Sequence, residues 1–274
     1  MPTIPSGQPP LPRQESHQAR EIAESFGVDA ERYDRSRPRY PEEMVQAILA
    51  AGPGRDVLDV GIGTGIVARQ FQAAGCHVFG VEPDERMAEF ARRGGTEVEV
   101  STFETWDPAG RTFDIVVAGQ AWHWVDTVVG AAKAAEVLRP GGLLAPFWNV
   151  SQPPPELERA FADVFRKVVP DSPVGQIPTG SASQLYAAMC DKTSDGIRQS
   201  GAFTEPQQQQ FHWQQQYTRD EYLEYSATTG ATTRLPPPIL DRVLAGLGTA
   251  IDAAGGTFTV HYTAAMVTAV RTID

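Results

Sequence analysis

Short apolar runs alternate with stretches of helical periodicity between residues 41 and 150. The runs are continuous, as in strands covered on both faces, and the stretches between them repeat apolar residues every three or four positions. Strands are predicted at 57–60, 77–81, 97–101, 113–118 and 143–148. Helices are predicted from Pro41 onward and around 67–74, 87–91 and 128–138. This alternation predicts an α/β fold with a doubly wound, mostly parallel sheet.

The rhythm changes after Asn149. An amphipathic helix is expected at 155–169, whereas residues 170–200 are rich in Pro, Ser and Gly and predict only a short helical patch around Leu185 and Met189. Further elements are expected as a strand within 203–217, a helix around 240–251 and a β segment at 257–271. Glutamines flank the alternating Phe211 and Trp213, so the strand within 203–217 is expected at a solvent-exposed edge.

Composition marks the first residues off from the rest. Residues 1–20 are rich in Pro, Gln and Ser and predict a flexible leader, and residues 21–274 predict one domain. No apolar run approaches the roughly 20 residues that span a bilayer, and the start of the chain has no apolar signal segment. Cys76 and Cys190 are expected as unpaired thiols. We therefore expect a cytoplasmic protein.

Charge narrows the choice of partners. The chain has 274 residues, of which 23 are Lys or Arg and 34 are Asp or Glu, so its formal net charge is −11. Phosphate contacts need clustered cations, so neither a nucleic acid nor an anionic membrane is expected as a partner. The five histidines show no metal-ligand spacing, so no metal is expected. A small-molecule substrate is expected, and the oligomeric state stays open.

The sequence VLDVGIGTG holds the strongest chemical signal. Gly61, Gly63 and Gly65 lie between a predicted strand and a predicted helix, where backbone N–H groups can approach a ligand. The turn also fits the dinucleotide pattern G-x-G-x-x-A. Asp59 distinguishes a dinucleotide from S-adenosylmethionine as the ligand of this turn. Its carboxylate would repel the diphosphate of a dinucleotide by about 1 kcal/mol in water and by several kcal/mol in a partly buried site. The cationic ammonium and sulfonium of S-adenosylmethionine would be attracted instead.

A second acid, Glu82, ends the second predicted strand, where a carboxylate can accept both ribose hydroxyls. At these residues the sequence resembles the class I S-adenosylmethionine-dependent methyltransferases. The stretch Y-x-x-x-R-P-x-Y-P at 33–41 and the stretch A-x-H-W-x-D at 121–126 are similar to a small-molecule branch that includes trans-aconitate methyltransferase-like enzymes.

The resemblance implies a Rossmann-like, seven-stranded sheet with an antiparallel last strand, a lid at 26–41 and a small helical cap at about 151–200. It implies S-adenosylmethionine as cofactor and O-methylation of a small-molecule carboxylate or hydroxyl as the reaction. The implied cofactor residues are Asp59, Gly61, Gly63, Gly65, Glu82, Met87 on the adenine, Phe103 and Glu104 at the adenine edge, and Tyr33 and Arg37 from the lid. Arg37 could instead pair with an anionic substrate, and Tyr40 is expected to contact the substrate.

His123 is the candidate catalytic base, since a hydroxyl acceptor benefits from a base of near-neutral pKa whereas a carboxylate needs none. Alternatively, His123 packs between Trp122 and Trp124 and orients the loop. The two tryptophans are expected either to face a flat or cationic group of the substrate or to pack in the core. Two other functions stay open at this point, a nicotinamide-dependent oxidoreductase and a non-catalytic S-adenosylmethionine-binding module.

Overall fold

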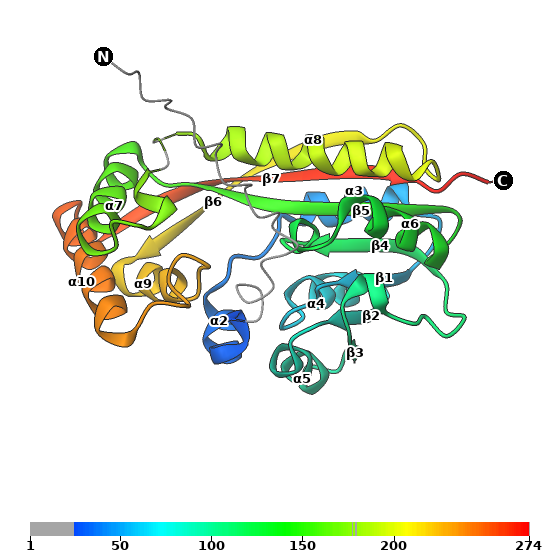
Figure 1. Cartoon of the computed structure of the whole chain (residues 1–274), viewed down its shortest axis with the longest axis horizontal. Coiled ribbons are helices and arrows are strands. Elements are labelled where there is room, and N and C mark those ends of the chain that lie inside the picture. The colour runs from blue at the N-terminus through cyan, green and yellow to red at the C-terminus, as the bar shows by residue number, and fades with distance from the viewer. Residues whose placement is uncertain (1–24, 177, 179, 274) are drawn as a thin grey trace, which may run out of the picture.

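The computed structural model describes residues 25–176, 178 and 180–273. Seven strands form one sheet in the order β3-β2-β1-β4-β5-β7-β6 (Figure 1). The strands are β1 (Asp56–Val60), β2 (His77–Glu82), β3 (Glu97–Val100), β4 (Phe113–Gly119), β5 (Leu138–Gln152), β6 (Gln207–Thr218) and β7 (Thr257–Val270). Strands β1 to β5 pair in parallel, and β7 runs antiparallel to both β5 and β6. The predicted fold class is therefore confirmed, and β6 lies at the edge, as its glutamines predict.

Helices cover both faces of the sheet. One face carries α3 (Glu42–Ala51), α4 (Ile66–Ala73) and α5 (Glu85–Arg93), and the other carries α6 (Thr127–Val137) and α8 (Ala182–Ser200). Alternate residues of β4 feed the two cores, since Val116 packs with α6 and α8 whereas Ile115 and Val117 pack with α3 and α4. This explains why β4 is apolar throughout rather than alternating.

A helical cap surrounds the ends of β5, β6 and β7 that project beyond the parallel strands (Figure 1). It consists of α7 (Pro155–Val168), α9 (Arg219–Ala227) and α10 (Pro237–Ala253). Between the cap and α5 lies α2 (Ala30–Ser36), preceded by the short helix η2 (Phe26–Asp29). The third core of the protein belongs to the cap and includes Phe161, Tyr222 and Phe258.

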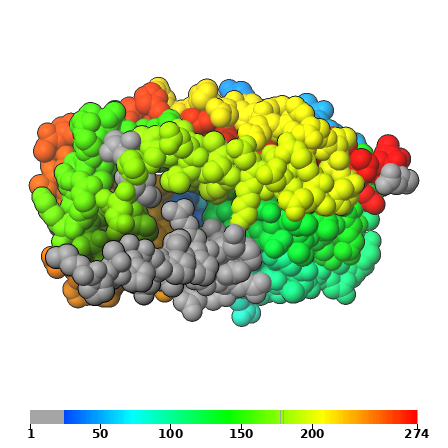
Figure 2. All heavy atoms as spheres, turned by 45° about the horizontal axis from the view of Figure 1, so that its top comes forward, coloured from blue at the N-terminus to red at the C-terminus, as the bar shows by residue number. Residues whose placement is uncertain are grey.

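The prediction of only a short helical patch within 170–200 was wrong, because α8 is one continuous helix of 19 residues. It buries a stripe of small residues, including Thr193, Ser194 and Gly196, which hydropathy alone does not mark as a core face. At Gly196 a Cβ would lie 2.5 Å from Thr127, so the small stripe lets α8 approach α6 closely. Figure 2 shows α8 and the chain leading into β6 spread over this face as a yellow-green to yellow band.

The cap therefore differs from the expected insertion at about 151–200. Helix α8 covers the sheet, whereas α9 and α10, which lie outside that range, belong to the cap. The sequence did not predict α9 at all. The expected leader at 1–20 lies outside the described residues.

The expectation of unpaired thiols is confirmed. Cys76 and Cys190 are both free and buried. Among the helices of the described part, none combines the length and the apolar character that crossing a membrane requires.

Candidate functional site

The glycine turn at the carboxyl end of β1 adopts a backbone that favours glycine. Gly61, Gly63 and Gly65 have φ angles of 65°, 57° and 85°. At Gly61 a Cβ would also lie 2.6 Å from the Cβ of Ala121. The Gly61 amide donates to the carbonyl of Val81 at 2.8 Å, which ties the turn to β2. The turn thus brings the end of β1, the start of α4 and the end of β2 together.

Asp59 is a buried carboxylate without a partner. Its exposed fraction is 1%, and neither side-chain oxygen accepts a hydrogen bond from the residues described here. Burial raises the pKa of Asp59 well above its ordinary value and the neighbouring Glu82 carboxylate raises it further, while the nearby Ala68 amide lowers it by less than these two effects raise it. A buried unpaired carboxylate is destabilising, so this site fits a cationic ligand group that would supply the missing partner.

Glu82 is also buried, but each of its carboxylate oxygens accepts a hydrogen bond from a backbone amide. Its Oε2 accepts from the Gly63 amide at 2.8 Å and its Oε1 from the Asp84 amide at 3.0 Å. Burial raises the pKa of Glu82 to about 7, although both amides favour the ionised form. The two bonds fix the carboxylate beside the glycine turn, where its remaining lone pairs can accept further hydrogen bonds.

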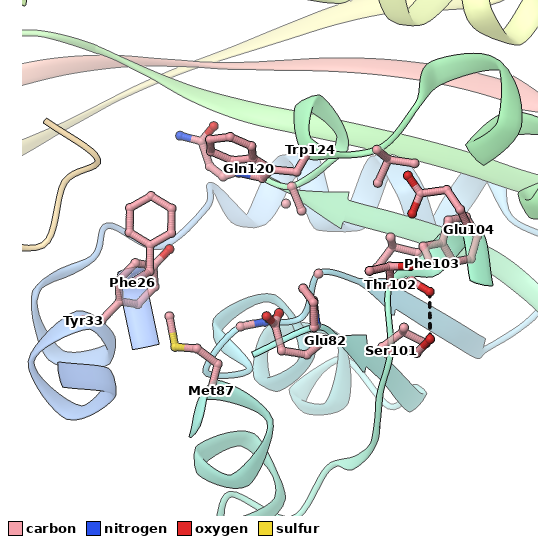
Figure 3. A pocket seen from close by; sticks show the side chains of 18 residues that line it. Phe26, Tyr33, Glu82, Met87, Ser101, Thr102, Phe103, Glu104, Gln120 and Trp124 are labelled. Carbon is pink, nitrogen blue, oxygen red and sulfur yellow. Dashed lines mark hydrogen bonds between the residues drawn. The ribbon is translucent and has the colours of Figure 1, made fainter. Parts of the chain in front are cut away.

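A cleft of about 870 Å³, here called the Glu82 cleft, opens beside this carboxylate. Figure 3 shows Phe26 and Tyr33 on one side, Met87 and Glu82 below, residues 101–104 opposite, and Gln120 and Trp124 above. Of the predicted site residues, the lining includes Tyr33, Gly61, Gly63, Glu82, Met87, Phe103, Glu104 and Trp124. Trp124 therefore lies with the predicted cofactor residues.

A second cavity, here called the Asp59 pocket, adjoins the first and shares Tyr33, Gly61, Gly63, Gly119 and Gln120 with it. The rest of its lining includes the predicted residues Arg37, Tyr40 and Asp59, together with Thr64, Asn149, Tyr225 and Tyr262. Gly65 is not among the described residues that line either cavity; it is the N-cap residue of α4 instead. The structure thus brings the two predicted acids into neighbouring cavities.

Arg37, at the C-terminal end of α2, lies between Tyr33 and the cap. Its guanidinium carbon lies 4.5 Å from the ring centroid of Tyr33 and 5.5 Å from that of Tyr225. One terminal nitrogen donates to the Thr228 carbonyl in the cap. The Nε–H is buried and has no partner within the described part of the chain. Arg37 therefore places a positive charge in the wall of the Asp59 pocket.

Tyr40 also lines the Asp59 pocket. Its ring meets Phe147 edge to face with centroids 4.7 Å apart. Burial raises the pKa of Tyr40 well above its ordinary value, and the phenol therefore stays neutral near pH 7. It can bind a ligand as a hydrogen-bonding phenol but not as a phenolate.

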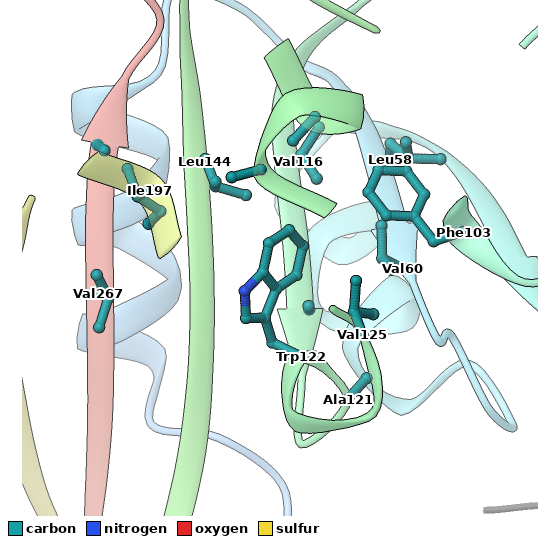
Figure 4. Packing of buried hydrophobic residues seen from close by; sticks show 14 of the residues in the cluster. Leu58, Val60, Phe103, Val116, Ala121, Trp122, Val125, Leu144, Ile197 and Val267 are labelled. Atoms are coloured by element: carbon teal, nitrogen blue, oxygen red, sulfur yellow. The ribbon is translucent and has the colours of Figure 1, made fainter. Parts of the chain in front are cut away.

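Trp122 does not face a ligand, and the prediction that it contacts the substrate was wrong. Its side chain is fully buried in the core around Val116, Val125 and Leu144 (Figure 4). It is not among the described residues that line the two cavities. The alternative that Trp122 packs in the core is the correct one, because the loop after β4 directs its indole against residues of α6.

His123 is likewise not among the described lining residues of either cavity. Its Nδ1 accepts a hydrogen bond from the Trp148 indole at 3.2 Å, and its ring centroid lies 4.6 Å from that of Trp124. Burial lowers the pKa of His123 to about 4. With Nδ1 as acceptor, the neutral ring carries its proton on Nε2, which leaves no nitrogen free to accept another. This geometry favours the alternative that His123 orients the loop.

Several lining residues were missed from the sequence. Phe26 precedes the recognisable stretch, and Gln120 follows β4 with a φ of 55°, an uncommon angle outside glycine. Asn149, Tyr225 and Tyr262 come from β5, α9 and β7, which no local pattern connects. The positive φ of Gln120 is a backbone feature that no residue pattern discloses.

Helix α2 is fastened to the molecule at both ends of the site. Asp34 pairs with Arg69, whose other terminal nitrogen donates to the Thr64 carbonyl at 2.8 Å in the glycine turn. Arg35 pairs with Glu224 of α9 at 3.0 Å. These ion pairs hold Tyr33 and Arg37 over the two cavities. Within the described part, no cluster of three or more potential metal ligands occurs.

Comparison with known proteins agrees with this geometry. A family model described as "Methyltransferase domain" matches residues 57–142. An uncharacterized methyltransferase of Mycobacterium bovis is 37% identical over 132 residues, which cover 47% of this chain and 54% of that protein. The malonyl-[acyl-carrier protein] O-methyltransferase of Enterobacter lignolyticus is 29% identical over 53% of this chain and 60% of its own length. The chain thus matches just over half the length of these relatives.

A solved structure from Anaeromyxobacter dehalogenans, provisionally assigned to the type II methyltransferases, superposes with a TM-score of 0.59. It covers 85% of this chain and 97% of its own, at 23% identity. The chain therefore contains a methyltransferase domain, and its fold is that of the class I S-adenosylmethionine-dependent methyltransferases. The cofactor of this class is S-adenosylmethionine.

Proposed function

We propose that the protein transfers a methyl group from S-adenosylmethionine to a carboxylate oxygen of a small molecule. The observation that carries the proposal is the unpaired, buried carboxylate of Asp59 beside the glycine turn. A cationic methionine end would complete it, whereas the diphosphate of a nicotinamide cofactor would add a like charge. The oxidoreductase alternative is therefore not favoured.

The two cavities divide the cofactor between them in this proposal. Asp59 and the turn glycines Gly61 and Gly63 would hold the methionine end, and Glu82 would accept hydrogen bonds from the ribose. The adenine would lie in the Glu82 cleft against Met87, Phe103, Glu104 and Trp124, with Tyr33 above it. Residues 26–41 would act as a lid, because α2 is anchored by ion pairs rather than by a core of its own.

The acceptor would enter the Asp59 pocket with its carboxylate directed at Arg37. When bound, S-adenosylmethionine supplies an electrophilic methyl carbon, and displacement by an oxygen leaves a neutral thioether with no proton to move. Arg37 would orient the carboxylate through its positive charge, and Tyr40 would restrict water and offer a neutral phenol. Holding the oxygen in line with the methyl is the main task of these residues.

A carboxylate is favoured over a hydroxyl because His123, the candidate base, is poorly suited to accept a proton. His123 has a pKa of about 4 and uses Nδ1 to bind Trp148, so it is a poor acceptor for a hydroxyl proton. The relative named as a malonyl-[acyl-carrier protein] O-methyltransferase also acts on oxygen, according to its name. We further infer that no nucleic acid takes part, given the net charge of −11, and that the protein works in the cytoplasm.

The cofactor proposal is tested by titrating the protein with S-adenosylmethionine, S-adenosylhomocysteine and NADH in a calorimeter. Micromolar binding of the first two without NADH binding is expected. NADH binding in their place would overturn the proposal.

The reaction is tested by mass spectrometry of a panel of carboxylic acids and phenols incubated with S-adenosylmethionine. Methyl esters are expected among the acids. Cofactor binding without transfer to any acid or phenol would instead favour a non-catalytic binding module.

A further inference from the structure

The cap carries a half-open cavity that the proposed cofactor and acceptor sites do not use. This cap cavity, of about 840 Å³ including the space open to solvent, lies between α7, α9 and α10. Its lining includes Phe161, Ala162, Phe165, Val174 and Leu247. We infer that the cap cavity binds the apolar tail of the methyl acceptor, so the substrate is a carboxylic acid with an alkyl-like chain. This inference rests on the proposed function.

The cap cavity adjoins the Asp59 pocket at Tyr225, which lines both. Strand β5 links them as well, since Asn149 lines the Asp59 pocket and Ser151 lines the cap cavity. Residues two apart on a strand share a face, so these two positions lie about 7 Å apart on one side of β5. A ligand that is anchored in the Asp59 pocket can therefore extend directly into the cap.

Two hydroxyl groups of the cap cavity are already engaged. The Thr229 hydroxyl donates to the Ser226 carbonyl at 3.0 Å, and the Thr232 hydroxyl donates to the Thr229 carbonyl at the same distance. Since these donors are satisfied within α9 and the turn that follows, the cavity presents its aromatic and aliphatic surface to a guest. An apolar chain gains affinity there without displacing these two hydrogen bonds.

Charge fixes the direction of the ligand. Glu158 is the charged residue among those described in the cap cavity, and its carboxylate accepts from the Gly180 amide at 3.0 Å. A carboxylate ligand would be repelled at that end and attracted by Arg37 at the other. The acid group therefore lies in the Asp59 pocket, and the uncharged tail lies in the cap.

The test uses straight-chain saturated monocarboxylates from acetate to decanoate as probes. Their dissociation constants are measured by calorimetry on the full-length protein, with and without saturating S-adenosylhomocysteine. Each added methylene that becomes buried should tighten binding about three- to fourfold until the cavity is full, after which the affinity should level off. An affinity that does not depend on chain length would overturn the inference.

Filling the cavity provides the matched variant. Ala162→Trp should weaken decanoate at least tenfold and change butyrate less than twofold, and Ala162→Leu should give a smaller effect in the same direction. Ala188→Trp makes the same change on the exposed surface of α8 and should change neither ligand. Equal effects of Ala162→Trp on butyrate and decanoate would refute a tail site.

S-adenosylhomocysteine binding serves as the separate check on the proposed function and on folding. If it binds all variants equally while chain length has no effect, only the tail inference fails. If the unmodified protein does not bind it at all, the proposed function itself fails, whatever the acids do.

Discussion

Replacing Asp59 with Asn should strengthen the fold of the cofactor-free protein and weaken the cofactor complex. Asp59 is 1% exposed and neither oxygen has a hydrogen-bond partner within the described structure, so its ionised form is destabilising when no cation is present. Asparagine keeps the shape of the side chain and removes the charge. A residue that served only the fold would show the opposite sign in the first measurement.

The size of the stability effect depends on pH in a way that can be worked out. The folded-state pKa of Asp59 is raised above its ordinary value of 3.8, so the folded protein holds this proton more tightly than the unfolded chain. The stabilisation is therefore complete below pH 3.8 and is lost as the pH rises through the folded-state pKa. Across that window the advantage of Asp59→Asn should grow by up to about 1.4 kcal/mol per pH unit.

The affinity effect follows from the lost charge. A hydrogen bond to a charged group contributes about 1.5–3 kcal/mol, so S-adenosylmethionine should bind Asp59→Asn roughly 10- to 150-fold more weakly. Urea unfolding of the cofactor-free proteins between pH 4 and 8 measures the first effect, and calorimetry measures the second. Destabilisation by Asp59→Asn at every pH, or unchanged cofactor affinity, would refute the assignment of Asp59.

Asp114→Asn is the matched control. Burial raises the pKa of Asp114, but hydrogen bonds from Arg139 at 2.6 Å and the Asp56 amide at 3.0 Å outweigh it, so the net pKa lies below its ordinary value. Its stabilisation is present above the unfolded-state pKa and is lost only in acid. Between pH 5 and 8, Asp114→Asn should therefore be less stable than the unmodified protein by a constant amount.

Three further predictions concern the acceptor, the loop after β4 and the second acid. Arg37→Lys should raise KM for the acceptor about 10- to 150-fold and change S-adenosylhomocysteine affinity less than threefold, whereas Arg198→Lys on the exposed surface of α8 should change neither; a loss confined to cofactor affinity would place the cofactor carboxylate at Arg37 instead. His123→Leu should lower the free energy of unfolding by about 1–3 kcal/mol, because the Trp148 indole loses its hydrogen-bond acceptor, whereas His123→Asn retains an acceptor. Both variants should keep kcat within tenfold of the unmodified protein. A hundredfold fall in kcat for both variants would restore His123 as the base. Burial raises the pKa of Glu82 to about 7, so the stabilisation that its proton gives the cofactor-free fold is lost between pH 4.5 and 7. The free energy of unfolding of the unmodified protein, relative to that of Glu82→Gln, should therefore fall by about 3 kcal/mol across that range. A difference between the two proteins that does not change with pH in urea unfolding would contradict this.

The parallel half of the fold could be predicted closely because its signals are local. Continuous apolar runs such as 113–118 identify strands that are buried on both faces, and β4 occupies Phe113–Gly119. Helix α8 was missed because its buried face uses Thr193, Ser194 and Gly196, which hydropathy does not separate from a loop. Its packing depends on how closely α6 approaches, which is a property of the tertiary structure.

The residues of the candidate site also fall into those that local signals predict and those that depend on the tertiary structure. Asp59, Glu82 and the glycines lie at strand ends and turns, so their spacing in the sequence already predicts their place in space. The A-x-H-W-x-D stretch carries no such information about side-chain direction. The short helix η4 (Trp122–Trp124) sends Trp122 into the core and Trp124 into the Glu82 cleft, although the two residues are only two positions apart.

The boundaries of the family match have a physical counterpart in how the two cavities are assembled. Residues 57–142 contain both acids and the glycine turn but exclude Arg37, Asn149 and Tyr225. Asn149 joins the excluded parts, since its Nδ2 donates to the Arg39 carbonyl at 3.0 Å and its Oδ1 accepts from the Trp213 indole at 3.2 Å. Under the proposed function, the acceptor pocket is thus built in part by residues 26–41, the long antiparallel strands and the cap, whereas Asp59 and Glu82 lie in the matched domain. Changes in those segments would then alter the acceptor without replacing either acid, so the proposal predicts that selectivity depends largely on residues outside the matched domain.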